Sequence, residues 1–155
     1  MDRERAVAVI GAGNCGQSEA EMARELGRLL ALRGYTLVSG GMGGVMRAAN
    51  EGARAAGGRS IGILPGHDRR ESAEPNDIRI ATGLGHMRNY LVVLNADVIV
   101  AIHGGWGTLS EVALAKKIGK SVIAIGKWSC IEGVISATDS AEALDWVEQM
   151  LGKEE

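Results

Sequence analysis

The sequence predicts an α/β fold: a single Rossmann-like domain with three layers and a doubly wound parallel sheet. Three observations carry this prediction. Short apolar runs alternate with segments of helical periodicity, most of these runs are apolar on both faces, and glycine clusters follow several of them. Parallel strands are buried on both faces because right-handed helical crossovers cover the sheet from both sides.

The composition fits one globular domain spanning residues 1–155. Of the 155 residues, 46% are hydrophobic and 23% are charged, a balance that supports one sizeable core. The 23 glycines follow no repeat, so they mark turns and not low complexity. Phe is absent, and aliphatic side chains must therefore fill the core.

The first half of the chain repeats one unit: a strand, a glycine turn and a helix. The run Ala6-Val-Ala-Val-Ile10 enters Gly11-Ala-Gly-Asn-Cys-Gly16. Ser18 and Glu21 predict a capping box at the start of the next helix. The expected strands of this half are 6–10, 36–39 and 60–64, and the expected helices are 18–32 and 45–56.

The second half continues the alternation after a polar loop at 65–76 that holds both prolines. Thr108-Leu-Ser-Glu111 predicts a second capping box with Thr108 as the N-cap. The expected strands are 78–81, 97–102, 121–125 and 134–136, and the expected helices are 86–95, 108–118 and a last one that is capped by Asp139 or Ser140 and ends near Leu151.

The turn His103-Gly-Gly-Trp-Gly-Thr108 separates an apolar strand from a helix start. Its glycines allow the backbone to approach a ligand closely, and the free N–H groups and positive dipole end of the helix favour an anion. The sequence therefore predicts a phosphate-binding turn. Glu111 is either the cap partner of Thr108 or a group that handles the rest of the ligand, and the residues alone favour the cap.

The first turn, Gly11-x-Gly13-x-x-Gly16, matches the dinucleotide-binding fingerprint, which is a weak signal by itself. A NAD site also needs an acidic residue about 20 residues further on, and no Asp or Glu lies between Leu26 and Asn50. Hydride transfer on NAD is therefore the less favoured function. Asn14 and the glycines of 40–44 can contact a ligand or simply form tight turns.

Charge and cysteine content favour a small-molecule partner in the cytoplasm. The net charge is −2 without a run of like charges, so no nucleic acid or membrane partner is expected. Cys15 and Cys130 lack metal-ligand spacing, and no metal site is expected. The N-terminal residues do not resemble a signal peptide, and no apolar run approaches ~18 residues.

Three ordered motifs resemble the Lonely Guy type of nucleotide-binding Rossmann proteins, some of which have been labelled lysine decarboxylases. They are Ser39-Gly-Gly-Met-Gly-Gly-Val-Met46, Met87-Arg88-Asn89 and Gly104-Gly-Trp-Gly-Thr-Leu-Ser-Glu111. Within this group the chain is similar to the set related to the molybdenum cofactor carrier protein. No lysine lies in a glycine-rich turn to anchor a pyridoxal Schiff base, so decarboxylation is rejected on chemistry.

The resemblance implies that Arg88 and Glu111 match the catalytic pair of the Lonely Guy phosphoribohydrolases, and that the 104–108 turn matches their phosphate cradle. Those enzymes have Pro where this chain has His103, and Lys where it has Asn89. We therefore expect binding of a phosphorylated nucleotide or a pterin-like ligand, with the molybdenum cofactor as one candidate, and phosphoribohydrolase activity as the alternative. The predicted ligand-binding residues are Gly11, Gly13, Asn14, Gly40, Gly41, Gly43, Gly44, Gly104, Gly105, Trp106, Gly107 and Thr108.

The resemblance also implies dimers or pairs of dimers. We expect the helices at 45–56 and 86–95 to help form the interface. Ala48, Ala49 and Ala53 permit close packing there, although a contact within the chain explains them equally well. Nothing in the local chain can bury Trp106, at the tip of a glycine turn. It can stack on a ligand base, pack against a partner subunit or, as the third alternative, remain exposed at the surface.

Overall fold

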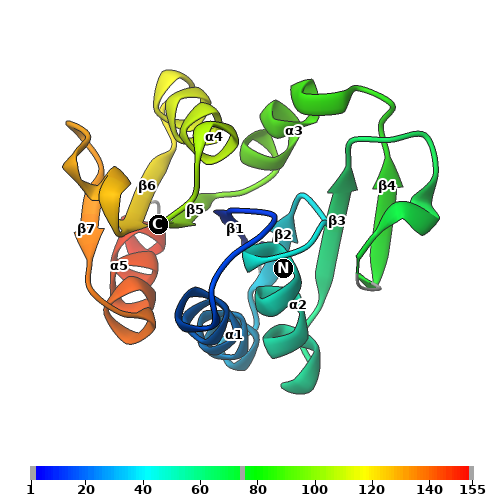
Figure 1. Cartoon of the computed structure of the whole chain (residues 1–155). Coiled ribbons are helices and arrows are strands. Elements are labelled where there is room, and N and C mark those ends of the chain that lie inside the picture. The colour runs from blue at the N-terminus through cyan, green and yellow to red at the C-terminus, as the bar shows by residue number, and fades with distance from the viewer. Residues whose placement is uncertain (1–2, 74–75, 154–155) are drawn as a thin grey trace.

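A computed structural model describes residues 3–73 and 76–153. It confirms the predicted class: in this part of the chain, one sheet of seven parallel strands lies between two layers of helices (Figure 1). The strand order is β4-β3-β2-β1-β5-β6-β7. The strands are β1 Ala6–Gly11, β2 Thr36–Ser39, β3 Ser60–Leu64, β4 Ile78–Ala81, β5 Val98–Ile102, β6 Ser121–Ile125 and β7 Ile135–Ala137.

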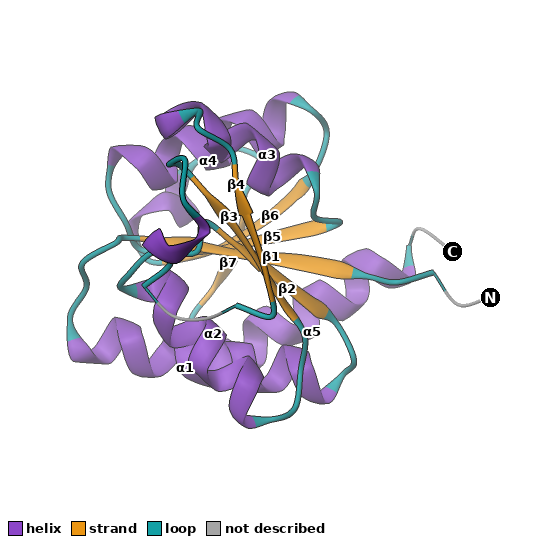
Figure 2. Cartoon of the chain, turned by 90° about the vertical axis from the view of Figure 1, so that its right-hand side faces the viewer, coloured by secondary structure: helices purple, strands orange, loops and turns teal. Residues whose placement is uncertain are grey.

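Two unequal layers of helices cover the sheet (Figure 2). One face carries α1 Gln17–Leu32, α2 Val45–Ala55 and α5 Ser140–Gly152, and the other carries α3 Arg88–Leu94 and α4 Trp106–Lys117. Side chains of β1 explain why the sequence forms a buried strand: Val7 and Val9 enter the core under α1 and α2, while Ala8 and Ile10 enter the core under α3 and α4.

Both predicted capping boxes are wrong, because a glycine caps each helix and the helix begins earlier. The α1 helix starts at Gln17 with Gly16 as N-cap, and Glu19 accepts a hydrogen bond from the Gly16 amide at 3.4 Å. The α4 helix starts at Trp106 with Gly105 as N-cap. Glycine is tolerated at the N-cap, where the backbone is not yet helical. Thr108 therefore lies inside α4.

The predicted helix at 86–95 consists of two parts: a 3₁₀ turn at Gly85–Met87 and then α3. Other boundaries move by one or two residues. The predicted loop at 65–76 contains a 3₁₀ turn at Arg69–Glu71, and the proline that it holds at position 75 lies outside the described residues. The C-terminal helix is capped by Asp139, whose carboxylate accepts a hydrogen bond from Glu142 N at 2.8 Å.

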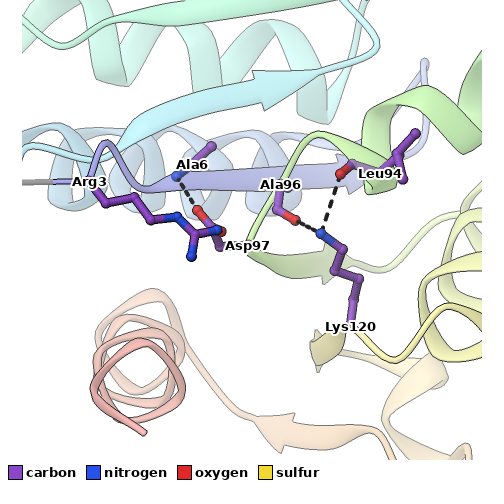
Figure 3. Close-up of polar contacts among 6 residues, drawn as sticks. All are labelled: Arg3, Ala6, Leu94, Ala96, Asp97 and Lys120. Carbon is purple, nitrogen blue, oxygen red and sulfur yellow. Dashed lines mark hydrogen bonds and ion pairs between the residues drawn. The ribbon is translucent and has the colours of Figure 1, made fainter. Parts of the chain in front are cut away.

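Polar contacts at the amino edge of the sheet fix the far end of α3 (Figure 3). Lys120 Nζ donates to the carbonyl oxygens of Leu94 at 3.3 Å and Ala96 at 2.6 Å. Asp97 accepts from Ala6 N at 2.9 Å and from Arg3 at 2.8 Å. These bonds hold the starts of β1 and β5 together, and they neutralise the carbonyl end of a short helix.

None of the helices within residues 3–73 and 76–153 is both long enough and apolar enough to cross a bilayer. The expected cytoplasmic location remains a prediction.

Candidate functional site

The sheet has a topological switch point between β1 and β5, because the chain leaves these neighbouring strands toward opposite edges. Ligands of open α/β sheets bind in the crevice at the carboxyl ends of such strands. A cavity of about 300 Å³ lies there, at the lower end of the range for small-molecule sites. It is lined by Gly11, Ala12, Gly13, Met46, His86, Arg88, Asn89, Gly105, Gly107, Thr108 and Glu111.

The amino edge also has a hollow, of about 380 Å³, but its charged groups are occupied. Arg3 and Asp97 bond to each other, and Lys120 bonds to two backbone carbonyls (Figure 3). Charged groups that already have partners offer little to a ligand. The cavity at the switch point is therefore the better candidate site.

The structure separates the predicted ligand-binding residues into two groups. Gly11, Gly13, Gly105, Gly107 and Thr108 line the cavity, as do Arg88 and Glu111. The remaining predicted residues, which are Asn14, Gly40, Gly41, Gly43, Gly44, Gly104 and Trp106, do not line it.

The 40–44 turn lies behind the first glycine turn and supports it. A Cβ atom on Gly44, where φ is 62°, would lie 2.1 Å from the carbonyl oxygen of Ala12. Val45 N also donates to that oxygen at 3.0 Å. Gly40 passes so close to Arg88 that a Cβ there would lie 2.6 Å from Nη2. The 40–44 and 104–108 turns thus leave the same edge of the sheet, but the former braces the site from outside.

The 104–108 turn is open toward the cavity. A Cβ atom on Gly105 or Gly107 would meet nothing within 4 Å. The first bond inside α4 runs from Leu109 N to Gly105 O at 3.0 Å, so the N–H groups of the preceding helical residues are available to a ligand. Together with the dipole of this 12-residue helix, they form a site suited to an anion.

A chain of hydrogen bonds positions Arg88, whose side chain is buried. Its Nη2 donates to Gly40 O at 3.4 Å, and its Nη1 donates to Asn89 Oδ1. Asn89 Nδ2 in turn donates to Ser110 Oγ at 3.2 Å, and this hydroxyl donates to Gly107 O at 2.6 Å. The network joins α3 to the turn before α2 and to the start of α4. Arg88 Nε is buried and has no hydrogen-bond partner among the described residues, which is costly for a charged donor.

Glu111 is buried in the cavity wall, where burial raises its pKa to about 8, and the positive charge of Arg88 opposes this shift. Burial lowers the pKa of Arg88, and the charge of Glu111 raises it. At neutral pH Glu111 therefore holds its proton beside a charged arginine. A perturbed carboxyl group in a cleft is typical of a functional site. No group of three or more His, Cys, Asp or Glu side chains among the described residues is arranged to hold a metal ion.

The model of the SLOG cluster4 family matches residues 4–151. The chain belongs to the SLOG cluster4 family.

Two of the solved structures similar to this SLOG cluster4 chain are of proteins described as molybdenum cofactor binding or carrier proteins. The molybdenum cofactor binding protein of Rippkaea orientalis is 35% identical with a TM-score of 0.90, covering 96% of this chain and 98% of that one. The molybdenum cofactor carrier protein of Chlamydomonas reinhardtii is 38% identical with a TM-score of 0.89, covering 97% and 99%.

Curated relatives include enzymes. An uncharacterized protein of Archaeoglobus fulgidus is 39% identical over 140 residues, covering 90% of this chain and 92% of the relative. The cytokinin riboside 5'-monophosphate phosphoribohydrolase of Mycobacterium tuberculosis is 33% identical over 123 residues. That match covers 74% of this chain and 66% of the enzyme, so the chain spans just under two thirds of that relative's length.

Sequence reasoning did not predict His86 and Met46, which line the cavity of this family member. Two positions along a regular helix differ by about 200°, so the predicted helix at 86–95 would have turned His86 away from Arg88. In the structure, His86 lies in the 3₁₀ turn Gly85–Met87 that precedes α3, and both His86 and Arg88 line the cavity. The available signal was the position of both residues at the quoted motifs: His86 directly precedes Met87-Arg88-Asn89, and Met46 ends the motif that begins at Ser39.

Two large apolar side chains flank the lining residues. Met87 lies in sequence between His86 and Arg88 and is 73% exposed, and Trp106 lies between Gly105 and Gly107 and is 84% exposed. The prediction that Trp106 is not buried by its own chain is confirmed.

Proposed function

We propose that this protein binds a small phosphorylated ligand, a nucleotide or a pterin-like molecule, in the cavity at the switch point. The observation that carries the proposal is the combination of an open glycine turn at the N-terminus of α4 with a buried, incompletely paired Arg88. The phosphate would accept hydrogen bonds from the N–H groups at 105–108. The similarity to molybdenum cofactor carrier and binding proteins supports a pterin-like ligand, and the hydrolase relatives support a nucleotide.

Arg88 and Glu111 would bind the remainder of the ligand. Arg88 Nε offers one charge-assisted hydrogen bond to a ligand oxygen or ring nitrogen. Glu111 in its protonated form offers one donor and one acceptor. A neutral carboxyl group also avoids the repulsion that a carboxylate would exert on a nearby phosphate.

Thermal-shift measurements with AMP, pterins, pterin phosphates and inorganic phosphate test the proposal. A ligand that binds only the native state must raise the melting temperature, by an amount that grows with its concentration. In the Gly105→Val variant, whose added side chain would enter the cavity, we expect the shift to disappear while the unliganded melting temperature stays near that of the wild type. Unchanged ligand affinity in Gly105→Val would remove this turn from the site.

A second candidate function is hydrolysis of a nucleoside 5'-monophosphate to its free base, and the protonated state of Glu111 favours it. A carboxyl group with a pKa of about 8 can donate a proton to a leaving base at neutral pH. We expect little or no hydrolysis of AMP, since His103 and Asn89 replace the Pro and Lys of the hydrolases. Release of free adenine by the wild type, lost in both Glu111→Gln and Arg88→Ala, would establish the enzyme instead.

We further propose that the protein forms dimers or larger homo-oligomers through the face that carries α3. The exposed apolar side chains there are Ile78, Ile80, Leu84, Met87, Tyr90 and Leu94. The α2 residues Ala48, Ala49 and Ala53 are buried in the core cluster on the side of α1 and α2. A contact within the chain therefore accounts for these alanines. Light scattering should give a mass of at least twice 16.2 kDa at micromolar concentration, and a monomer would contradict this proposal.

A further inference from the structure

The segment that follows β6 braces the glycine turn of the site from its outer side. We propose that Trp128 is a positioning residue that fixes the orientation of this turn toward the cavity. The inference rests on the proposed function, because it concerns how the same turn meets its ligand. Trp128 lies in the 3₁₀ turn Lys127–Cys130 and does not line the cavity. The strand that precedes this turn, β6, is the neighbour of β5 in the sheet (Figure 1).

Three contacts join this segment to the first two residues of the turn. His103 N donates to Ile125 O at 2.9 Å, which extends the pairing of β5 with β6. The His103 ring lies against Gly126, where a Cβ atom would be 2.3 Å from Nδ1. Trp128 Nε1 donates to Gly104 O at 3.2 Å. The turn is thus held at its base, while Gly105 and Gly107 remain open.

The backbone of the turn needs such a support. His103 has a φ of 47°, and it is the one non-glycine residue with a positive φ in the part of the chain that the structure describes. A left-handed conformation costs such a residue roughly 1–2 kcal/mol. Gly104 follows with a φ of 97°. Without external contacts, both residues could relax to more common conformations.

The hydrogen bond from Trp128 decides where the amide of Gly105 points. The carbonyl of Gly104 and the N–H of Gly105 belong to one planar trans peptide group, so they point in opposite directions. Trp128 draws the carbonyl toward the outer side of the turn, and the N–H consequently points away from Trp128. Since glycines flank this peptide on both sides, its flipped orientation is sterically accessible. The indole selects the orientation that presents the N–H to a ligand.

Packing against the core fixes the indole independently of the turn. The Trp128 ring is half-buried and packs against the core cluster under α3 and α4. The ammonium group of Lys127 lies 4.7 Å from the ring centroid, within the range of a cation–π contact. The indole therefore holds the turn and does not simply follow it.

The test is Trp128→Phe, which keeps an aromatic ring but removes the donor. The matched control is Trp146→Phe on the opposite face of the sheet, where the ring packs in the other core cluster. With AMP as the probe in isothermal titration calorimetry, we expect Trp128→Phe to weaken affinity about ten-fold or more, and Trp146→Phe to leave it unchanged. Equal affinities in the two variants would overturn the proposal.

Nuclear magnetic resonance supplies a readout that a purely structural role would not move. The amide of Gly105 should give one sharp signal in the unliganded wild type and in Trp146→Phe, but a broadened or doubled signal in Trp128→Phe. If Trp128→Phe does not fold, a scalar coupling across the hydrogen bond from Trp128 Nε1 to the Gly104 carbonyl decides the question in the wild type, and its absence refutes the proposal. Failure of the wild type to bind any probe would refute the proposed function, whereas a sharp Gly105 signal in Trp128→Phe would refute the positioning role alone.

Discussion

The two glycine turns at 40–44 and 103–108 look alike in sequence but differ in what their glycines meet. In the first turn, added Cβ atoms would collide with backbone: 2.1 Å from Ala12 O at Gly44 and 2.8 Å from Gly13 O at Gly43. In the second turn, Gly105 and Gly107 face open space beside the cavity. Glycine is thus required by the fold at one turn and leaves room for a ligand at the other.

The largest expected effect comes from Glu111, on the side of the second turn. Its pKa rises from 4.5 to about 8 on folding, so between these values the folded state binds a proton that the unfolded state releases. The contribution of Glu111 to stability is therefore fully present below about pH 4.5, falls as pH rises toward 8, and levels off above it. The loss should be on the order of 4 kcal/mol. Urea unfolding between pH 5 and pH 9 measures it.

Glu111→Gln should remove this decline, because the amide does not titrate. The pKa values of the exposed carboxyl groups Glu25, Asp68 and Glu142 are lowered, so these groups act below about pH 4.5 and do not mimic the effect. No Asp or Glu lies between Leu26 and Asn50, so the 40–44 turn contributes no carboxyl group to the dependence of stability on pH. An unchanged pH profile in Glu111→Gln would place the titrating group elsewhere.

A substitution pair tests the comparison of the two turns directly. Gly44→Ala should destabilise the protein by about 2 to 4 kcal/mol. The backbone of Gly44, with φ 62° and ψ −127°, is in a conformation that costs an alanine about 1–3 kcal/mol, and the collision with Ala12 adds overpacking strain. Gly105→Ala should change stability by less than about 1 kcal/mol, because its φ is −106° and its Cβ has space. Equal losses of unfolding free energy would mean that the turns do not differ.

The smallest expected effect concerns Asn89, which links Arg88 to Ser110. Asn89→Ala removes the acceptor of Arg88 Nη1 and the bond to Ser110, so Arg88 should lose its fixed orientation. We expect affinity for AMP to fall about ten-fold, in line with the loss of one hydrogen bond to a charged group. Asn95→Ala is the control: it removes a bond to Leu91 O at the far end of α3, and calorimetry should show no change. A loss shared by both variants would assign the effect to α3 as a whole.

The fold could be predicted from the sequence because its signals are local. Strands that are apolar on both faces and helices with one apolar stripe give the layers, and the alternation gives the parallel connections. The starts of the helices were harder to predict from the sequence. Gly16 and Gly105 act as N-caps, although Ser18 and Thr108 have the better capping side chains. At both sites, the geometry of the preceding turn decides where the helix begins.

The site could be predicted only in part, because its geometry depends on contacts that are remote in sequence. The sequence indicated Arg88, Glu111 and the 104–108 turn. Both side chains and three residues of the turn meet at one cavity, whereas Gly104 and Trp106 do not line it. It could not distinguish Gly44, which meets Ala12, from Gly105, which meets a cavity. It also gave no pairing partner for Trp128, since Gly104 lies 24 positions away.

The most direct test of the central claim is a titration of the ¹⁵N-labelled protein with AMP and inorganic phosphate, followed by nuclear magnetic resonance. If a phosphate binds at the N-terminus of α4, the amide signals of Gly105, Trp106 and Gly107 must shift most and saturate together. Those of Gly43 and Gly44, which face backbone, should move little. Shifts concentrated at Gly43 and Gly44, or at Arg3 and Lys120 on the amino edge, would contradict the account, as would the absence of any saturable shift.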